Sequence, residues 1–185
     1  MKSGGALLVL SLLATFGCTN SENAGPISDA RSTSDGERPL LAPTRAGFET
    51  VANAMQPRCG TLDCHGQIGR NLRLFGSRGL RLLAKDNPAD NVTSVEEYDA
   101  TYWSVIALEP EIITQVVRDG GQRPERLTLI RKARGVDEHK GGTLMKPGDD
   151  LDNCLLIWLA GNVADSFCRK AAAFTRPGAA TDAMP

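Results

Sequence analysis

Apolar residues recur at helical spacing near the start of the chain's central region. Four of them, three or four positions apart, are Phe48, Val51, Ala52 and Met55. Side chains at this spacing lie on one face of a helix, so the pattern predicts a short helix. The helix is expected to stop at Pro57, because proline has no N–H to donate to the preceding turn.

Two further helices are expected in the middle of the chain. Ser94 followed by Glu97 is a capping box, which predicts a helix that begins there and runs through Ile106. Pro110 interrupts the pattern. A second helical piece over 111–117 is expected to end at the Gly-Gly pair that follows it.

The last third of the chain contains two more amphipathic segments. Residues 126–133, which follow Pro124, predict a short helix. Asp149 or Asp150 is expected to cap the last clear helix, because an acidic side chain accepts hydrogen bonds from the first N–H groups of a helix. The apolar residues of that helix are Leu151, Cys154, Leu155 and Trp158.

Residues 71–82 follow a different pattern. Apolar and polar residues alternate on either side of a Gly-Ser-Arg-Gly break. Alternation with a period of two is typical of strands, so this segment predicts a small β-hairpin. The whole chain is therefore expected to be mainly α, with one short β-hairpin.

The N-terminus has the pattern of an export signal. Lys2 supplies a positive charge, and residues 6–16 form an apolar run about half as long as a membrane span requires. Residues 1–17 are therefore predicted to be a signal peptide. Cys18 follows a small residue and resembles the cleavage site of bacterial lipoproteins, which implies a lipid on its thiol. Plain cleavage and release into the periplasm is the alternative.

Composition divides the rest of the chain. Residues 18–47 are rich in Ser, Asn, Asp, Gly and Pro without apolar periodicity, which predicts a flexible, lipid-anchored tether. Residues 48–174 are long enough for one domain and too few for two. The tail, 175–185, contains Pro, Gly and Ala and is expected to be disordered.

The most informative segment is 59–66, in which Cys59 and Cys64 precede His65. Covalent attachment of a c-type haem requires two thiols for the vinyl groups and an imidazole beside the second thiol for the iron. The usual spacing is C-x2-C-H, and this chain has C-x4-C-H, a less common variant. The segment predicts one covalent haem c, with Cys59 and Cys64 as thioethers and His65 as proximal iron ligand. A small disulfide loop beside a histidine is the alternative.

Export changes how the remaining cysteines are interpreted, because an oxidising compartment permits disulfides. With Cys18 assigned to lipid and two cysteines to haem, Cys154 and Cys168 are left and are predicted to form a disulfide. One continuous helix would hold them about 21 Å apart. The helix must therefore end between them, at the Gly-Asn pair 161–162, and a second helix over 163–173 must fold back. Two thiols on a continuous helix are the alternative.

A second axial ligand is expected downstream of the haem motif. Met145 lies in a Pro-containing loop just before the expected helix 149–160. This arrangement resembles class I cytochrome c proteins, which implies a small cytochrome c-like helical domain around one haem, with Met145 as distal ligand. The long insert between His65 and Met145 departs from the family pattern and adds an inserted helical segment. His139, the only other histidine, is the alternative distal ligand.

The charge balance argues against nucleic acid as a partner. The net charge is −1 and few basic residues are contiguous, whereas nucleic-acid-binding domains concentrate positive charge. Six basic residues do crowd one segment: Arg118, Arg123, Arg126, Arg131, Lys132 and Arg134. We interpret them as a solvated face, and a docking surface for an acidic redox partner is the alternative.

Together these features predict a membrane-tethered c-type cytochrome that carries single electrons in the bacterial cell envelope, either on the periplasmic side of a membrane or on the outer membrane. Its partners would be the membrane, through the lipid, and a redox protein of the envelope. An electron carrier is expected rather than an enzyme. The alternatives are a haem enzyme or sensor with an open iron site and a non-haem, disulfide-stapled interaction domain. A Cys2His2 zinc site, at irregular spacing, would use Cys59, Cys64, His65 and His139.

Overall fold

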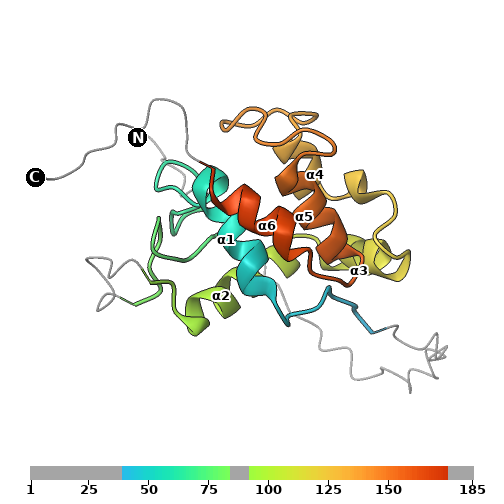
Figure 1. Cartoon of the computed structure of the whole chain (residues 1–185), viewed down its shortest axis with the longest axis horizontal. Helices are drawn as coiled ribbons and strands as arrows, with labels where there is room; N and C mark the ends of the chain where they lie inside the picture. The colour runs from blue at the N-terminus through green and yellow to red at the C-terminus, as the bar shows by residue number, and fades with distance from the viewer. Residues whose placement is uncertain (1–38, 84–91, 175–185) are drawn as a thin grey trace, which may run out of the picture. The chain divides into compact units, whose positions relative to one another are not determined.

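The computed structural model describes residues 39–83 and 92–174 (Figure 1). The predictions of a signal peptide over 1–17, a lipid on Cys18 and a disordered tail over 175–185 lie outside these residues. None of the helices in the described ranges is long and apolar enough to cross a membrane.

Helices make up nearly all of the regular structure in the described ranges, and no β-strand occurs there. The prediction of a mainly α domain is thus confirmed. In chain order the elements are α1 (Phe48–Cys59), α2 (Val95–Ile106), α3 (Pro110–Arg118), the 3-10 turn η2 (Pro124–Arg126), α4 (Thr128–Ala133), α5 (Asp150–Leu159) and α6 (Asp165–Ala172).

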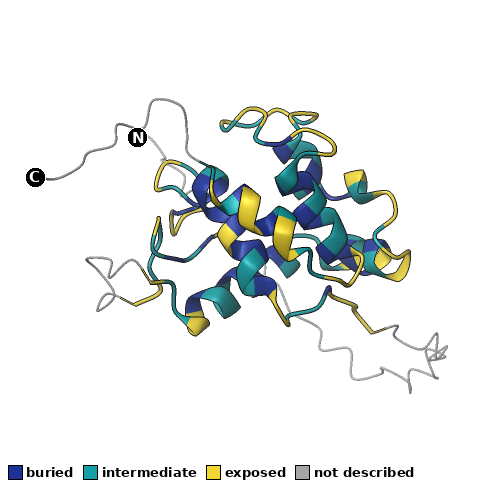
Figure 2. Ribbon diagram, viewed as in Figure 1, coloured by how far each residue is buried: buried dark blue, intermediate teal, exposed yellow. Residues whose placement is uncertain are grey.

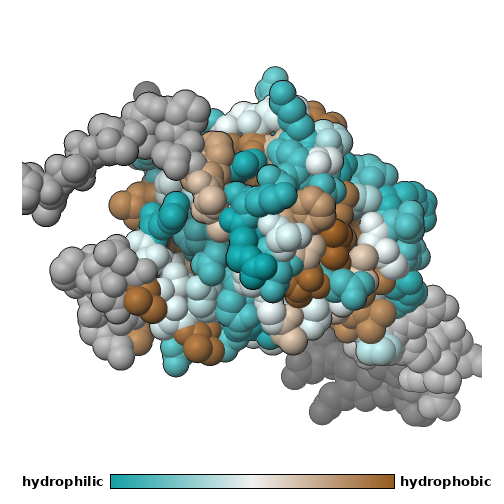
Figure 3. All heavy atoms as spheres, in the orientation of Figure 1, coloured by the Kyte–Doolittle hydropathy of each residue, from teal (hydrophilic) through white to brown (hydrophobic). Residues whose placement is uncertain are grey.

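Helices α1, α5 and α6 pack against one another, and α2 packs on α1 (Figure 1). Three aromatic rings meet in the core between them. The ring centroid of Phe48 lies 5.0 Å from that of Trp158 and 5.2 Å from that of Tyr102. The helices turn their buried faces inward (Figure 2), whereas the outward face of α6 is hydrophilic (Figure 3). Burial of large rings makes this cluster a main source of stability.

The last residues of the expected tether pack onto this core. The Trp158 indole N–H donates to the Thr44 carbonyl at 2.9 Å, and the Tyr102 hydroxyl donates to the Pro43 carbonyl at 2.8 Å. Pro43 is buried. The folded domain therefore extends to the N-terminal side of Phe48, the boundary expected from composition.

Two helix starts are confirmed in atomic detail. The Glu97 N–H donates to the Ser94 hydroxyl at 3.3 Å, and the Ser94 N–H donates to the Glu97 carboxylate at 3.0 Å. These reciprocal bonds are the capping box expected at the start of α2. At α5, the side chain of Asp149 accepts from the Asp152 N–H at 2.9 Å, so Asp149 is the cap.

Helix α1 continues past Pro57 to Cys59, so the expected stop at Pro57 is wrong. Proline removes the N–H that would donate to the carbonyl of Asn53. Because Asn53 is exposed, water can donate to that carbonyl instead, and the helix tolerates the proline in its last turn. The extra residues bring Cys59 onto the helix, where it is buried.

The helix predicted over 126–133 is shorter than expected. Residues 124–126 form the turn η2, and Leu127 is extended, with φ −78° and ψ 128°. Helix α4 begins only at Thr128. The Thr128 N–H donates to the Glu109 carboxylate at 2.7 Å, so a side chain from just before α3 satisfies the first turn of α4.

The β-hairpin predicted over 71–82 is also wrong, since this segment forms only an isolated bridge between Phe75 and Leu80. Within the segment the Gly76 N–H donates to the Leu80 carbonyl at 2.8 Å, but residues before Gly76 bond to α2 and not to a partner strand. The Phe75 N–H donates to the Thr101 hydroxyl at 2.9 Å, and the Arg73 N–H donates to the Ser104 hydroxyl at 2.8 Å. Hydroxyl groups of α2 thus take the place of a partner strand. The alternating pattern indicates only that Leu72 and Leu74 are buried.

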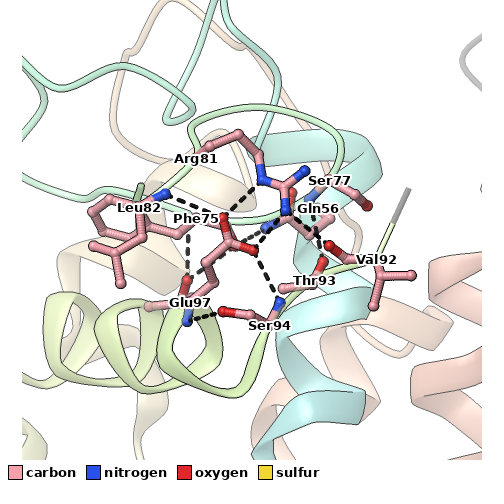
Figure 4. Close-up of polar contacts among 10 residues, drawn as sticks. Gln56, Phe75, Ser77, Arg81, Leu82, Val92, Thr93, Ser94 and Glu97 are labelled. Atoms are coloured by element: carbon pink, nitrogen blue, oxygen red, sulfur yellow. Dashed lines mark hydrogen bonds and ion pairs between the residues drawn. The ribbon is translucent and has the colours of Figure 1, made fainter. Parts of the chain in front are cut away.

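A buried ion pair holds the end of this segment (Figure 4). Arg81 Nε donates to the Glu97 carboxylate at 2.8 Å, and the Leu82 N–H donates to the same carboxylate at 3.1 Å. Burial raises the pKa of Glu97, but the bonds from Arg81 and from the Ser94 and Leu82 N–H groups outweigh it, so its pKa lies below the usual value. Glu97 therefore stays ionised, and its bonds hold the end of the 71–82 segment against α2.

The predicted helical hairpin and its disulfide are confirmed. Helix α5 ends at Leu159, and Gly161 has a φ of +90°, which glycine adopts without strain. Helix α6 then folds back beside α5. Cys154 and Cys168 form a disulfide with 4.9 Å between their α-carbons, so the alternative of two thiols on a continuous helix does not hold.

Candidate functional site

The two cysteines of the C-x4-C-H motif and its histidine are brought together by a tight loop after α1. Within it, the Cys64 N–H donates to the Thr61 carbonyl, and the His65 N–H donates to the Cys59 carbonyl, each at 2.9 Å. The second bond closes the loop on itself. Both cysteines are thiols in the structure, Cys59 buried and Cys64 partly exposed. The disulfide loop that was the alternative interpretation of the motif is thus not formed.

Glycines let neighbouring backbone pass close to this loop. A Cβ at Gly66 or at Gly79 would collide with the carbonyl oxygen of Gly60. Both positions therefore require glycine for close packing and not for an unusual backbone angle. Gly66, in the motif loop, and Gly79, in the 71–82 segment, therefore both pack closely against the end of α1.

The imidazole of His65 is held by a single backbone group. Its Nδ1 lies 3.1 Å from the carbonyl oxygen of Leu72. A carbonyl only accepts, so Nδ1 carries the proton and donates, which leaves the lone pair of Nε2 available. A metal-binding histidine commonly donates its other ring N–H to a backbone carbonyl in this way, which fixes its tautomer.

Electrostatics keep this imidazole neutral. Burial lowers the pKa of His65, and the positive charges on His139 and Arg70 lower it further, outweighing the bond to the Leu72 carbonyl. A neutral ring is the form that binds a metal. Both of the chain's histidines line the same cavity.

A cavity of about 530 Å³ adjoins the motif. Its volume lies within the roughly 300–1,000 Å³ typical of ligand and cofactor pockets. The motif contributes Cys59, Cys64 and His65 to the lining. Apolar side chains from elsewhere in the chain are Met55, Leu72, Leu108, Leu129 and Leu144, and cationic ones are Arg70, Lys132 and Lys140.

The two distal-ligand candidates occupy different environments. His139 lines the cavity, whereas Met145 is not among its described lining residues. Met145 is 1% exposed and belongs to the apolar core. His139 is partly exposed, and burial together with the charge of Lys132 lowers the pKa of its ring.

The donor set can be tested for its fit to a haem. Two thiols and a histidine with an available Nε2 lie along one mostly apolar cavity. His139 lines the same cavity, and its buried Nδ1 has no hydrogen-bond partner within the described residues. These residues suit a haem. Within 39–83 and 92–174 no three or more His, Cys, Asp or Glu side chains form a metal-binding group, so the four-ligand zinc site is not assembled.

The basic segment after α3 is largely neutralised within the domain. Its close ion pairs, each with 2.8 Å between nitrogen and oxygen, are Arg126–Asp119, Arg131–Asp137 and Arg134–Asp152. Paired charges at a surface attract a distant partner less than isolated ones do. The pairs leave less free positive charge for an acidic partner, and the Arg134 side chain, 15% exposed, is not part of a solvated face.

Sequence reasoning missed the groups that shape the cavity. The Leu72 carbonyl has no sequence signature because every residue carries one, and the leucines on the cavity wall are indistinguishable from ordinary core residues. No protein-family model, curated protein or solved structure matches this chain. The site therefore has to be argued from its own geometry.

Proposed function

We propose that this protein is a c-type cytochrome domain that carries single electrons in the bacterial cell envelope. One haem would be bonded through Cys59 and Cys64, with His65 as proximal iron ligand. The observation that carries the proposal is the placement of both thiols and a neutral histidine, its Nδ1 committed to Leu72, along one cavity of suitable volume.

Attachment requires no oxidant. Cys59 and Cys64 would hold the haem by adding S–H across its two vinyl groups: in each, one carbon would gain the sulfur, the other the thiol hydrogen, and the double bond would become single. The four residues between the two cysteines lie in a loop that is closed by the hydrogen bond from the His65 N–H to the Cys59 carbonyl. This closure supports the idea that the two extra residues of the motif bulge outward without disturbing the thiols.

The haem, when bound, supplies a one-electron iron couple, and the protein tunes it. The Leu72 carbonyl would orient His65 and raise its basicity. The apolar side chains from Leu108, Leu129 and Leu144 would exclude water from the cavity. Exclusion of water limits reorganisation around the iron and suits an electron carrier.

We place the protein in the envelope on the strength of its N-terminal sequence. A signal peptide over 1–17 and a lipid on Cys18 would tether the domain to the periplasmic side of a membrane or to the outer membrane. The disulfide between Cys154 and Cys168 is compatible with that oxidising compartment. The electron partner would be another redox protein of the envelope.

Covalent haem is the decisive test. The full chain is expressed in a bacterium with the c-type haem attachment machinery, and a denaturing gel is stained for haem peroxidase activity. The wild type should stain, and Cys59→Ser with Cys64→Ser should not. The double variant Cys154→Ala with Cys168→Ala keeps the motif and should still stain. A folded wild-type protein without the stain would overturn the proposal.

A further inference from the structure

The two candidates for the second axial ligand, Met145 and His139, lie in different parts of the structure. Met145 is sealed in the core, 1% exposed. Its backbone N–H donates to the Ala133 carbonyl at 3.1 Å, as does that of Leu144 at 2.8 Å. These bonds tie the end of the 135–145 loop to the end of α4. Met145 is therefore explained as a packing residue without any bond to iron.

The same bonds leave His139 at the far part of that loop, on the cavity that holds the haem motif. Its Nδ1 is buried and has no hydrogen-bond partner among the described residues. Leaving a buried polar atom unsatisfied costs free energy, and native structures seldom keep one without a reason. Because Nδ1 is sealed from solvent, the ring can offer only Nε2 to a ligand in the cavity that it lines.

Space for the His139 ring is provided by a glycine. A Cβ at Gly141 would lie 2.8 Å from His139 Nε2, closer than real Cβ contacts come. Any other residue at this position would displace the imidazole. The loop around His139 is thus shaped to hold this ring where it is.

The base of the loop is firmly anchored. Next to Ala133, the Arg134 guanidinium makes two bonds to the Asp152 carboxylate, at 2.8 and 3.0 Å. Asp152 is 1% exposed and also accepts from the Gly148 N–H at 2.8 Å. The residues that flank the loop on both sides are therefore tied to α5, and the loop contributes His139, Lys140, Gly141 and Leu144 to the cavity wall.

We infer that His139, and not Met145, is the second axial ligand of the haem, so that the iron is held by two imidazoles. This rests on the proposed function, since it presupposes a haem on Cys59 and Cys64. Thioether ligation raises the potential of a c-type haem. A bis-histidine site works at a lower potential, and its partners are then low-potential carriers.

The test compares His139→Ala with Met145→Leu in the full-length, haem-loaded protein. Met145→Leu conserves volume and should fold. The wild type should show a low-spin bis-imidazole signal by electron paramagnetic resonance and no long-wavelength sulfur-to-iron band. His139→Ala should lose the low-spin signal and regain it when imidazole is added. Met145→Leu should leave the spectrum and the midpoint potential unchanged.

The outcomes distinguish this inference from the proposed function. A wild type without covalent haem overturns both. Covalent haem with a spectrum that Met145→Leu alters and His139→Ala does not overturns the assignment of His139 alone. Covalent haem with spectra unchanged in both variants also overturns it, since neither residue then binds the iron.

Discussion

Arg81 Nε lies 2.8 Å from an oxygen of the Glu97 carboxylate, and the two side chains are 8% and 0% exposed. Glu97 also closes the capping box at the start of α2. One carboxylate therefore joins a helix start to the segment that supplies the Leu72 carbonyl. The Leu74 N–H in turn donates to the His65 carbonyl at 2.9 Å. The ion pair and the C-x4-C-H loop are therefore connected through the 71–82 segment.

Replacing this carboxylate should destabilise the fold strongly. Glu97→Gln keeps the shape but removes the negative charge that pairs with the buried Arg81 side chain, and breaking a buried pair in this way costs about 3–5 kcal/mol. Urea denaturation followed by circular dichroism would measure it. Asp165→Asn is the control, because it removes the exposed Arg169–Asp165 pair, 71% and 57% exposed, which contributes at most about 1 kcal/mol. Equal losses in the two variants would show that the buried pair has no special role.

The same pair makes stability depend on acid. The pKa of Glu97 is lower in the folded protein than its usual value of 4.5, because the bonds from Arg81 and the Ser94 and Leu82 N–H groups outweigh burial. Its contribution is therefore fully present above the unfolded-state pKa and is lost as pH falls through the folded-state pKa. The urea midpoint should drop on acidification below about pH 4.5. Glu49 also has a lowered pKa, so the Glu97 share is the part of the drop that Glu97→Gln removes. Parallel pH curves for the two proteins would refute it.

Local signals were predictable from the sequence, and contacts across the fold were not. The capping box requires only Ser94 and Glu97 three positions apart, and the structure forms it as expected. Arg81, which pairs with the same glutamate, is 16 positions away. A contact at that separation has no recognisable pattern in the sequence. The β-hairpin failed for a related reason: alternation reports which side chains are buried, but the hydroxyl of Thr101 took the place of a partner strand.

At the C-terminal end, the geometry of a disulfide predicted the helical hairpin better than residue propensities did. The reach of a disulfide required α5 to end between Cys154 and Cys168, and the turn at Gly161 fulfils that requirement. For the candidate site, the motif singled out Cys59, Cys64 and His65, which the structure brings to one cavity, and their bonds to a haem stay a prediction. The environment that favours His139 over Met145 could not be inferred, because a buried methionine and a ligand methionine look the same in a sequence.

If the proposed haem is bound, adding one carbon at Gly141 should disturb its iron. In Gly141→Ala the new Cβ would lie 2.8 Å from His139 Nε2, so the imidazole must move. The ferric protein should shift from low spin towards high spin, as measured by absorption and electron paramagnetic resonance. Gly69→Ala is the matched control, since Gly69 also lines the cavity and has no atom within 4 Å of an added Cβ. In a His139→Ala background, Gly141→Ala should add nothing, and a further spectral change there would contradict the assignment.

Removal of the lipid-accepting thiol should release the protein from the membrane fraction. The prediction rests on the likeness of the segment around Cys18 to a lipoprotein cleavage site. Multi-chain anchors hold stably, whereas a chain without lipid has only weak contacts. Cell fractionation of Cys18→Ser should find it in the soluble periplasm, and Ser21→Ala should remain with the membrane. A wild type wholly in the soluble fraction would rule out lipidation.

Loss of the disulfide should weaken the fold without removing the haem. Cys154 and Cys168 are both completely buried and 14 positions apart, and a bridge over a loop of that length contributes about 3 kcal/mol in the chain-entropy model. The double variant Cys154→Ala with Cys168→Ala should therefore unfold at lower urea concentration. A reductant should lower the wild-type midpoint and leave that of the double variant unchanged, which separates the bridge from the packing lost with the sulfur atoms. Because neither residue lines the cavity among the described residues, the haem stain should persist. Peptide mapping without reduction completes the test, and recovery of Cys154 and Cys168 as separate, alkylatable thiols would contradict both the bridge and the helical hairpin it closes.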